Sequence, residues 1–275
     1  MSMSYEECLS TRTPRPTPNV AHSVMDQFKM NGKVCVVTGG SRGIGQAIAE
    51  ALAEAGAHII IVHQTPDPTL EEKAAALATR CGVTVVKRRC NVADPVAVQS
   101  LTSAIRAEFG RLDVFVANAG VSIPKPILEQ TLEEYHTQMA VNVHGVFYCA
   151  KYVGAIFKEQ GFGNFIITGS ISGRVVTVPV DHITYNTSKA AVTHLGRSLA
   201  REWRDFARVN IVAPGYIETA MSNCEASNSE AIRMATMGRL GDVRELKAIY
   251  LYLASDASSF VTGAEFTVDG GYTLP

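Results

Sequence analysis

From Lys33 to the end of the chain, short runs rich in β-branched residues alternate with longer, alanine-rich amphipathic stretches. The short runs predict strands at residues 34–38, 58–62, 83–89, 113–117, 164–169, 208–213 and 264–268. The stretches between them predict helices near residues 43–55, 69–80, 95–109, 131–160, 184–204 and 242–254. Strands that alternate with helices are joined by right-handed crossovers, which require a parallel sheet covered on both faces. The expected fold is therefore α/β, with a doubly wound parallel sheet of about seven strands.

The first 27 residues differ in composition from the rest of the chain. They contain the sequence TRTPRPTP at residues 11–18, and such closely spaced prolines interrupt both helices and sheet ladders. We expect residues 1–27 to form a flexible arm and residues 28–275 a single domain, because no repeat or second change of composition follows. The sequence has no secretory signal and no apolar run of membrane-spanning length, so a cytoplasmic location is expected. A formal net charge of −1 favours neither nucleic acid nor a membrane surface as a partner.

A glycine-rich turn joins the first predicted strand to the first long helix. Its sequence is TGGSRGIG at residues 38–45, with an alanine-rich helix directly after it. Glycines in such a turn let the backbone bend sharply and approach a pyrophosphate, and the helix start presents free N–H groups to the phosphates. The turn predicts a dinucleotide site in a Rossmann-type fold, with these cofactor-binding residues: Gly39, Ser41, Arg42, Gly43, Ile44 and Gly45.

The spacing of this turn, TGxxxGxG, resembles the classical short-chain dehydrogenase/reductase family. Four further motifs fit that resemblance in sequence order: ANAG at 117–120, Asn142 inside a long helix, YNTSK at 185–189 and PGYIET at 214–219. The resemblance extends from about residue 28 to residue 272. Within the family, the chain looks like the fungal-type sorbose and L-xylulose reductases and mannitol dehydrogenases. It implies an enzyme that interconverts a ketone and a secondary alcohol by hydride transfer, without a metal ion.

The end of the second predicted strand indicates which nicotinamide cofactor is used. NAD-selective sites place a carboxylate there to accept the ribose 2′-hydroxyl, but this chain has His63. Arg42 in the glycine turn can pair with a 2′-phosphate, so the expected cofactor is NADP(H). The resemblance adds further cofactor-binding residues around the adenosine, ribose and nicotinamide: Asn91, Asn118, Ala119, Gly120, Tyr185, Lys189, Pro214, Gly215, Ile217 and Thr219.

Tyr185 and Lys189 are four residues apart in a predicted helix and therefore lie on one face. A phenol is a weak acid–base group at neutral pH, and a neighbouring ammonium is expected to lower its pKa. Tyr185 would then donate a proton to the carbonyl oxygen in reduction and accept the alcohol proton in oxidation. By the resemblance, Lys189 also holds the nicotinamide ribose, and Asn142 kinks its helix and positions a water for proton relay.

Two serines compete for the role of orienting the substrate carbonyl. Ser170 follows the fifth predicted strand directly and lies fifteen residues before Tyr185, whereas Ser172 has the spacing of thirteen that many family members have. Because loops absorb insertions more readily than strand ends move, we favour Ser170 and expect Ser172 to be its neighbour in the pocket. The predicted catalytic residues are Asn142, Ser170, Tyr185 and Lys189.

The substrate is less clearly indicated. A small-molecule ketone or alcohol is expected, contacted by residues 121–128, 172–184 and 215–239, and the resemblance favours a ketose or polyol. A tailoring reductase for a larger natural-product ketone would carry the same motifs. A non-catalytic NADP-binding regulator is a third alternative, but it would be expected to lack at least one of the four catalytic residues.

The two longest predicted helices also suggest self-association. A homo-oligomer is expected, with the tetramer as the family's usual form. We expect the outer faces of these helices to provide apolar residues for packing between copies: Val146, Cys149, Val153, Val192 and Leu195.

Overall fold

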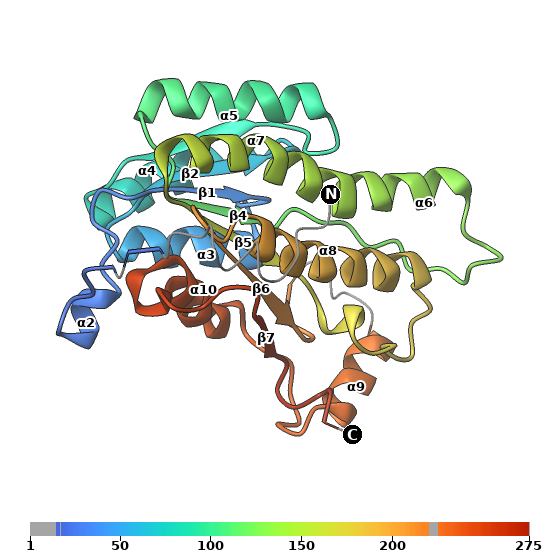
Figure 1. The fold of residues 1–275 in the computed structure, drawn as a ribbon. Helices are drawn as coiled ribbons and strands as arrows, with labels where there is room; N and C mark the ends of the chain where they lie inside the picture. Colours follow the sequence, from blue (N-terminus) through green and yellow to red (C-terminus); the bar gives the residue numbers. More distant parts are fainter. Residues whose placement is uncertain (1–14, 17, 220–224, 275) are drawn as a thin grey trace, which may run out of the picture.

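A computed structural model of the chain describes residues 15–16, 18–219 and 225–274. All seven predicted strands are present and parallel, and their order in the sheet is β3-β2-β1-β4-β5-β6-β7. Figure 1 displays this sheet between its helices. The doubly wound Rossmann-type architecture is therefore confirmed. The strands are β1 Val34–Thr38, β2 His58–His63, β3 Val85–Arg89, β4 Val114–Ala117, β5 Asn164–Thr168, β6 Arg208–Pro214 and β7 Glu265–Val268.

Helices cover both faces of the sheet (Figure 1). Buried residues of α3, α4 and α10 pack on one face, and buried residues of α5, α7 and α8 pack on the other. Among the described residues, none of the helices combines the length and apolarity needed to cross a membrane. The α-helices are α2 Val24–Gln27, α3 Gly43–Glu54, α4 Leu70–Cys81, α5 Pro95–Phe109, α6 Leu132–Met139, α7 Gly145–Gln160, α8 Ile183–Glu202, α9 Glu225–Met234 and α10 Lys247–Ala254.

The longest predicted helix, at residues 131–160, is interrupted. Thr131 caps α6 through a reciprocal pair of hydrogen bonds with Glu134, and a π-helical turn, Ala140–His144, then separates α6 from α7. The predicted helix at 242–254 begins as a 3₁₀ turn, Val243–Leu246, before α10. Helix α9 was not predicted, because its sequence EASNSEAIRM has no long apolar stripe.

The prediction that the two long helices present these apolar residues on their outer faces is wrong. Val146, Cys149, Val153 and Val192 are buried in the core of this same chain, and Leu195 packs partly against it. These side chains cover the sheet beneath α7 and α8, which is where an amphipathic helix buries its apolar stripe. The tetramer therefore stays a prediction without the surface that was assigned to it.

The N-terminal segment contacts the domain at several of its described residues. Residues 1–14 and 17 of the predicted arm lie outside the described residues. Arg15 Nη1 donates to the carbonyl of Ala207 at 3.3 Å, and α2 precedes a contact between the Phe28 and Tyr252 rings. Met30 is the first fully buried side chain among the described residues.

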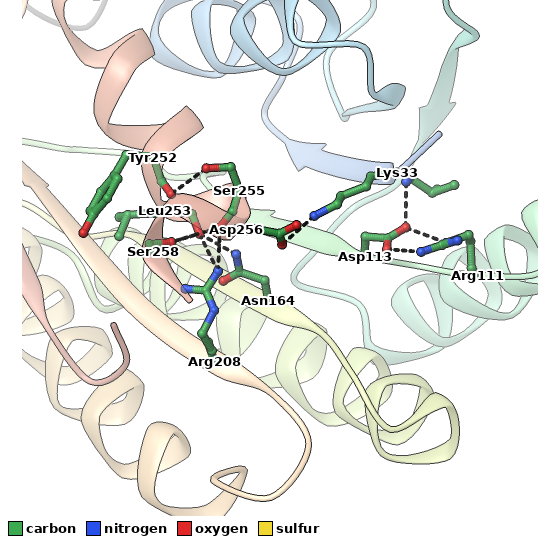
Figure 2. Close-up of polar contacts among 11 residues, drawn as sticks. Lys33, Arg111, Asp113, Asn164, Arg208, Tyr252, Leu253, Ser255, Asp256 and Ser258 are labelled. Atoms are coloured by element: carbon green, nitrogen blue, oxygen red, sulfur yellow. Dashed lines mark hydrogen bonds and ion pairs between the residues drawn. The ribbon is translucent and has the colours of Figure 1, made fainter. Parts of the chain in front are cut away.

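A group of polar residues closes the amino edge of the sheet, where β1, β4, β5 and β6 begin (Figure 2). Asp113 accepts from the Val34 amide and pairs with Arg111 through two bonds. Arg208 donates to the carbonyls of Leu253, Ser255 and Val261, each at 3.1 Å, and Asn164 also donates to the Leu253 carbonyl. Carbonyls at the end of α10 have no helical partner, so these donors satisfy them.

Arg208 is therefore expected to be a major stabilising residue of this edge. Burial lowers its pKa to about 10, so it remains charged at neutral pH. Arg208→Met should reduce the free energy of unfolding by about 2–3 kcal/mol, because three carbonyls each lose a charged donor and keep only their neutral ones. The control Arg80→Met removes an exposed ion pair with Glu54 and should cost less than about 0.5 kcal/mol. Urea denaturation of both variants tests this, and equal small losses would contradict it.

Candidate active site

The carboxyl ends of the parallel strands bring most of the predicted site residues to one edge of the sheet. The glycine turn follows β1, His63 ends β2, Asn118 follows β4 and Ser170 follows β5. Ligands of open α/β sheets bind at this edge, near the point where the strand order reverses. In this chain, the reversal lies between β1 and β4.

The glycine turn leads directly into the start of α3. Gly39 and Gly43 have φ values of +65° and +55°, which residues other than glycine rarely adopt. A Cβ atom at Gly45 would lie 2.1 Å from the Gly39 carbonyl oxygen and 2.6 Å from Asn118 Nδ2. Arg42 occupies the N-cap position, and no side chain caps the helix. The first turn of α3 thus keeps N–H groups available for an anion, with Ser41 and Ile44 beside them.

The predicted residues of the adenosine side lie at or just after strand ends. His63 pairs in register with Arg89, and its Nδ1 lies 3.1 Å from the Thr65 carbonyl oxygen, which can only accept a hydrogen bond. Asn91 follows β3, and its Oδ1 accepts from the Ala93 amide at 3.1 Å, which leaves its second lone pair for another donor. His63 is partly exposed and Asn91 is exposed, so both side chains are accessible to a cofactor.

The segment after β4 is fixed to the end of β1. The amides of Asn118 and Ala119 both donate to Thr38 Oγ1, at 2.9 and 3.1 Å. Gly120 lies beside the catalytic candidates, since a Cβ atom there would be 3.4 Å from Asn142 Oδ1 and 3.7 Å from Lys189 Nζ.

Tyr185, Ser170 and Lys189 are brought together. Ser170 Oγ accepts from the Ser172 amide at 3.1 Å, and the Ser170 side chain is near enough to the Tyr185 hydroxyl to lower the tyrosine pKa. Lys189 Nζ lies 5.5 Å from the centre of the Tyr185 ring and donates to the Thr168 carbonyl at 2.9 Å. Both serines are buried, but the contact with Tyr185 distinguishes Ser170 from Ser172.

The ionisation of this group differs from the sequence expectation. Burial raises the pKa of Tyr185, and the Ser170 side chain opposes that rise. Burial lowers the pKa of Lys189 to about 8. The expectation of a lowered tyrosine pKa is therefore wrong for the protein alone, because desolvation of the buried phenol is the largest effect on it.

Asn142 lies in the π-helical turn and makes three hydrogen bonds within the protein. Its Nδ2 donates to the Val121 carbonyl at 2.9 Å and to Ser188 Oγ at 3.0 Å, and its Oδ1 accepts from the Val121 amide at 2.9 Å. The side chain therefore holds the segment after β4 against the helix that carries Tyr185 and Lys189.

Gln138 repeats this contact and was missed from the sequence. It is fully buried, its Oε1 accepts from the Ile123 amide at 3.0 Å, and its Nε2 donates to the Ile123 carbonyl at 3.4 Å. The side-chain amides of Gln138 and Asn142 thus hold the backbone at two positions of the same segment, Ile123 and Val121. Gln130 also donates to the Ile123 carbonyl and accepts from Thr184, next to Tyr185. The i, i+4 spacing of Gln138 and Asn142 was the available signal.

His182 is a second residue that the sequence did not single out for catalysis. Its ring stacks on Tyr185, with ring centres 5.4 Å apart and an interplanar angle of 27°. Its Nε2 lies 2.6 Å from Thr177 Oγ1, and burial lowers the pKa of this histidine. Near neutral pH the neutral ring covers one side of the tyrosine.

The segment that follows β6 lies against both the glycine turn and the end of β7. Pro214 ends β6, and the Gly215 amide donates to the Val268 carbonyl at 2.9 Å. Ile217 is buried and bridges to Gly241. A Cβ atom at Gly43 would lie 3.6 Å from Thr219 Cγ2, which places Thr219 over the turn. Residues 220–224 of the predicted pocket lie outside the described residues.

Comparisons with known proteins identify the family of the chain. The family model described as enoyl-(acyl carrier protein) reductase matches residues 39–273. An NADP-dependent mannitol dehydrogenase from Hypocrea jecorina is 42% identical over 94% of this chain and 99% of its own, and a sorbose reductase from Candida albicans is 42% identical over 95% and 94%. The crystal structure of the NADPH-dependent 3-quinuclidinone reductase from Rhodotorula rubra has 47% identity and a TM-score of 0.93, and covers 96% of this chain and 100% of its own.

The chain therefore belongs to the classical short-chain dehydrogenase/reductase family. It is an NADP-dependent oxidoreductase that acts on CH–OH groups. The residues present fit the cofactor. The glycine turn gives an uncapped helix start that accepts phosphate, and the end of β2 carries His63, where a carboxylate would repel a 2′-phosphate.

Proposed function

We propose that this enzyme reduces the ketone group of a ketose to a secondary alcohol and oxidises the corresponding polyol in reverse. The observation that carries this proposal is the cluster of Tyr185, Ser170 and Lys189, in which the buried Ser170 side chain lowers the pKa of Tyr185 and the ammonium lies 5.5 Å from the ring. The names of the mannitol dehydrogenase and sorbose reductase relatives support a polyhydroxylated substrate.

Each of the chain's own groups has a defined part in this proposal. NADPH, when bound, supplies the hydride. Tyr185 gives its proton to the carbonyl oxygen, and Ser170 donates a hydrogen bond to that oxygen, where negative charge develops. Ser170 is prepared for this role, because the Ser172 amide occupies an acceptor site of its oxygen and leaves its proton to donate. Lys189 stabilises the phenolate, and Asn142 holds the pocket segment in place.

A second candidate substrate is a compact cyclic ketone. The 47% identity to the quinuclidinone reductase supports it, and so do the exposed apolar side chains of Val176 and Ile183, which adjoin Thr177 and His182 in the sequence. A compact ketone would need fewer hydrogen bonds than a sugar, so affinity for the two classes distinguishes the candidates.

The test is NADPH oxidation with three ketones: D-fructose and L-sorbose as ketoses, and 3-quinuclidinone. We expect the ketoses to have the higher kcat/KM. Ser170→Ala should lower kcat on the order of a hundredfold, because one donor to the developing oxyanion is lost. Ser172→Ala should mainly raise KM. Turnover of 3-quinuclidinone alone would replace the ketose proposal with the second candidate, and the reverse serine pattern would make Ser172 the donor.

Arg42 tests the proposed reading of the 2′-phosphate. Its guanidinium lies exposed at the N-cap of α3 and can form charge-assisted hydrogen bonds with that group. Arg42→Ala should raise the dissociation constant of NADPH about tenfold to a hundredfold, as expected for a hydrogen bond to a charged group, and leave that of NADH within about twofold. Fluorescence titration measures both constants. Equal losses for the two cofactors would exclude a role in reading the phosphate.

The pKa values of Tyr185 and Lys189 predict the pH dependence of reduction. Below about pH 8 Lys189 is charged and stabilises the phenolate that proton donation leaves. Above that pH the lysine is neutral, whereas Tyr185, with its raised pKa, still carries its proton. The kcat/KM of reduction should therefore fall as pH rises through about 8. In Lys189→Arg the guanidinium stays charged, so the fall should move to higher pH. The same inflection in both proteins would assign it to another group.

A further inference from the structure

Tyr250 is a buried polar residue that none of the catalytic roles uses. It lies in α10, its side chain is fully buried, and its hydroxyl is 2.7 Å from Thr168 Oγ1. Burial raises its pKa, so the hydroxyl keeps its proton at any pH at which the enzyme would be assayed. A phenol in this position costs desolvation that phenylalanine would avoid, and only its hydrogen bond offsets that cost.

The direction of this hydrogen bond follows from its neighbours. Thr168 Oγ1 donates its single proton to Asn118 Oδ1, at 3.2 Å, because a carbonyl oxygen can only accept. Tyr250 must therefore be the donor to Thr168. Asn118 then donates its two Nδ2 protons to the carbonyls of Thr38, at 3.0 Å, and Gly39, at 3.4 Å. The result is one directed chain of hydrogen bonds from α10 to the glycine turn.

This series of hydrogen bonds ends at a tightly packed point of the glycine turn. A Cβ atom at Gly45 would be 2.6 Å from Asn118 Nδ2, so the amide lies directly against the start of α3. Any rotation of that amide moves either the Thr38 and Gly39 carbonyls or the first helical turn. Lys189 does not depend on the same bonds, because it contacts Thr168 through the backbone carbonyl rather than the hydroxyl.

We propose that Tyr250 is a positioning residue for the cofactor: through Thr168 and Asn118 its hydroxyl holds the glycine turn in the form that receives the pyrophosphate. The inference rests on the proposed cofactor role of that turn. Because the pyrophosphate is common to NADPH and NADH, Tyr250 acts on both cofactors alike, whereas Arg42 acts on the 2′-phosphate alone.

The test compares Tyr250→Phe with Tyr252→Phe, two residues further along the same helix. Tyr252 packs its ring near Phe28 and Phe266, and within the described residues its hydroxyl has no hydrogen bond. Tyr250→Phe should raise the dissociation constants of NADPH and NADH by the same factor, about threefold to tenfold, as for one net hydrogen bond. Its kcat at saturating NADPH should stay within about twofold of wild type. Tyr252→Phe should change neither constant.

A second pair of variants tests Thr168, which lies between Tyr250 and Asn118 in this series of hydrogen bonds. Thr168→Val keeps the backbone carbonyl but leaves both the Tyr250 hydroxyl and Asn118 Oδ1 without a partner, so it should weaken both cofactors more than Tyr250→Phe does. Thr168→Ser restores the hydroxyl and should bring both constants back to within about twofold of wild type.

The outcomes separate this inference from the proposed function. Tyr250→Phe with a lower melting temperature but unchanged dissociation constants would overturn it and leave Tyr250 as a core residue. Equal effects of Tyr250→Phe and Tyr252→Phe would overturn it as well. If Arg42→Ala has no effect while Tyr250→Phe weakens both cofactors, the 2′-phosphate assignment fails and the inference holds.

Discussion

The close approach of the glycine turn to the start of α3 is the constraint on which the rest of the site depends. A Cβ atom at Gly45 would lie 2.1 Å from the Gly39 carbonyl oxygen, so any larger side chain would push the helix away from the strand. That contact brings uncapped N–H groups to the end of β1. It also leaves room for the Asn118 amide, which donates to the Thr38 carbonyl. An anion at this point replaces the missing helix cap, and phosphate binding and helix formation therefore use the same backbone groups.

At the catalytic group, burial and charge act in opposite directions. Desolvation raises the pKa of Tyr185 and lowers that of Lys189, so each group is pushed toward its neutral form. A neutral phenol suits proton donation, whereas a neutral lysine does not stabilise the phenolate that follows. The Ser170 side chain is the local contact that favours the phenolate.

The sheet and most of the site could be predicted from the sequence, because both follow local rules. Strands buried on both faces are read as continuous β-branched runs, and Ser170 was found from the position of a strand end. The family resemblance implied a kink at Asn142, which lies in the π-helical turn Ala140–His144, but apolar spacing alone did not reveal this turn, because a single wider turn is too short to change the pattern. Burial of Val146 and Val153 was misjudged for a related reason. Periodicity identifies an apolar stripe but not whether it faces the sheet or a second copy.

Sequence reasoning missed Gln138 and did not foresee the partners of Asn142, because both side chains pair with backbone groups elsewhere in the chain. Gln138 pairs with the Ile123 backbone, and Asn142 pairs with that of Val121. No sequence motif marks either contact, because the backbone partner has the same chemical groups whichever side chain it carries. The consequence is functional, since these two side chains fix the segment between β4 and α6 and, through Gln130 and Thr184, join it to the helix that carries Tyr185. Residues 121–128 are expected to contact the substrate, so the shape of that segment depends on buried amides outside the catalytic group. Substrate identity is the property least accessible to motif comparison for that physical reason.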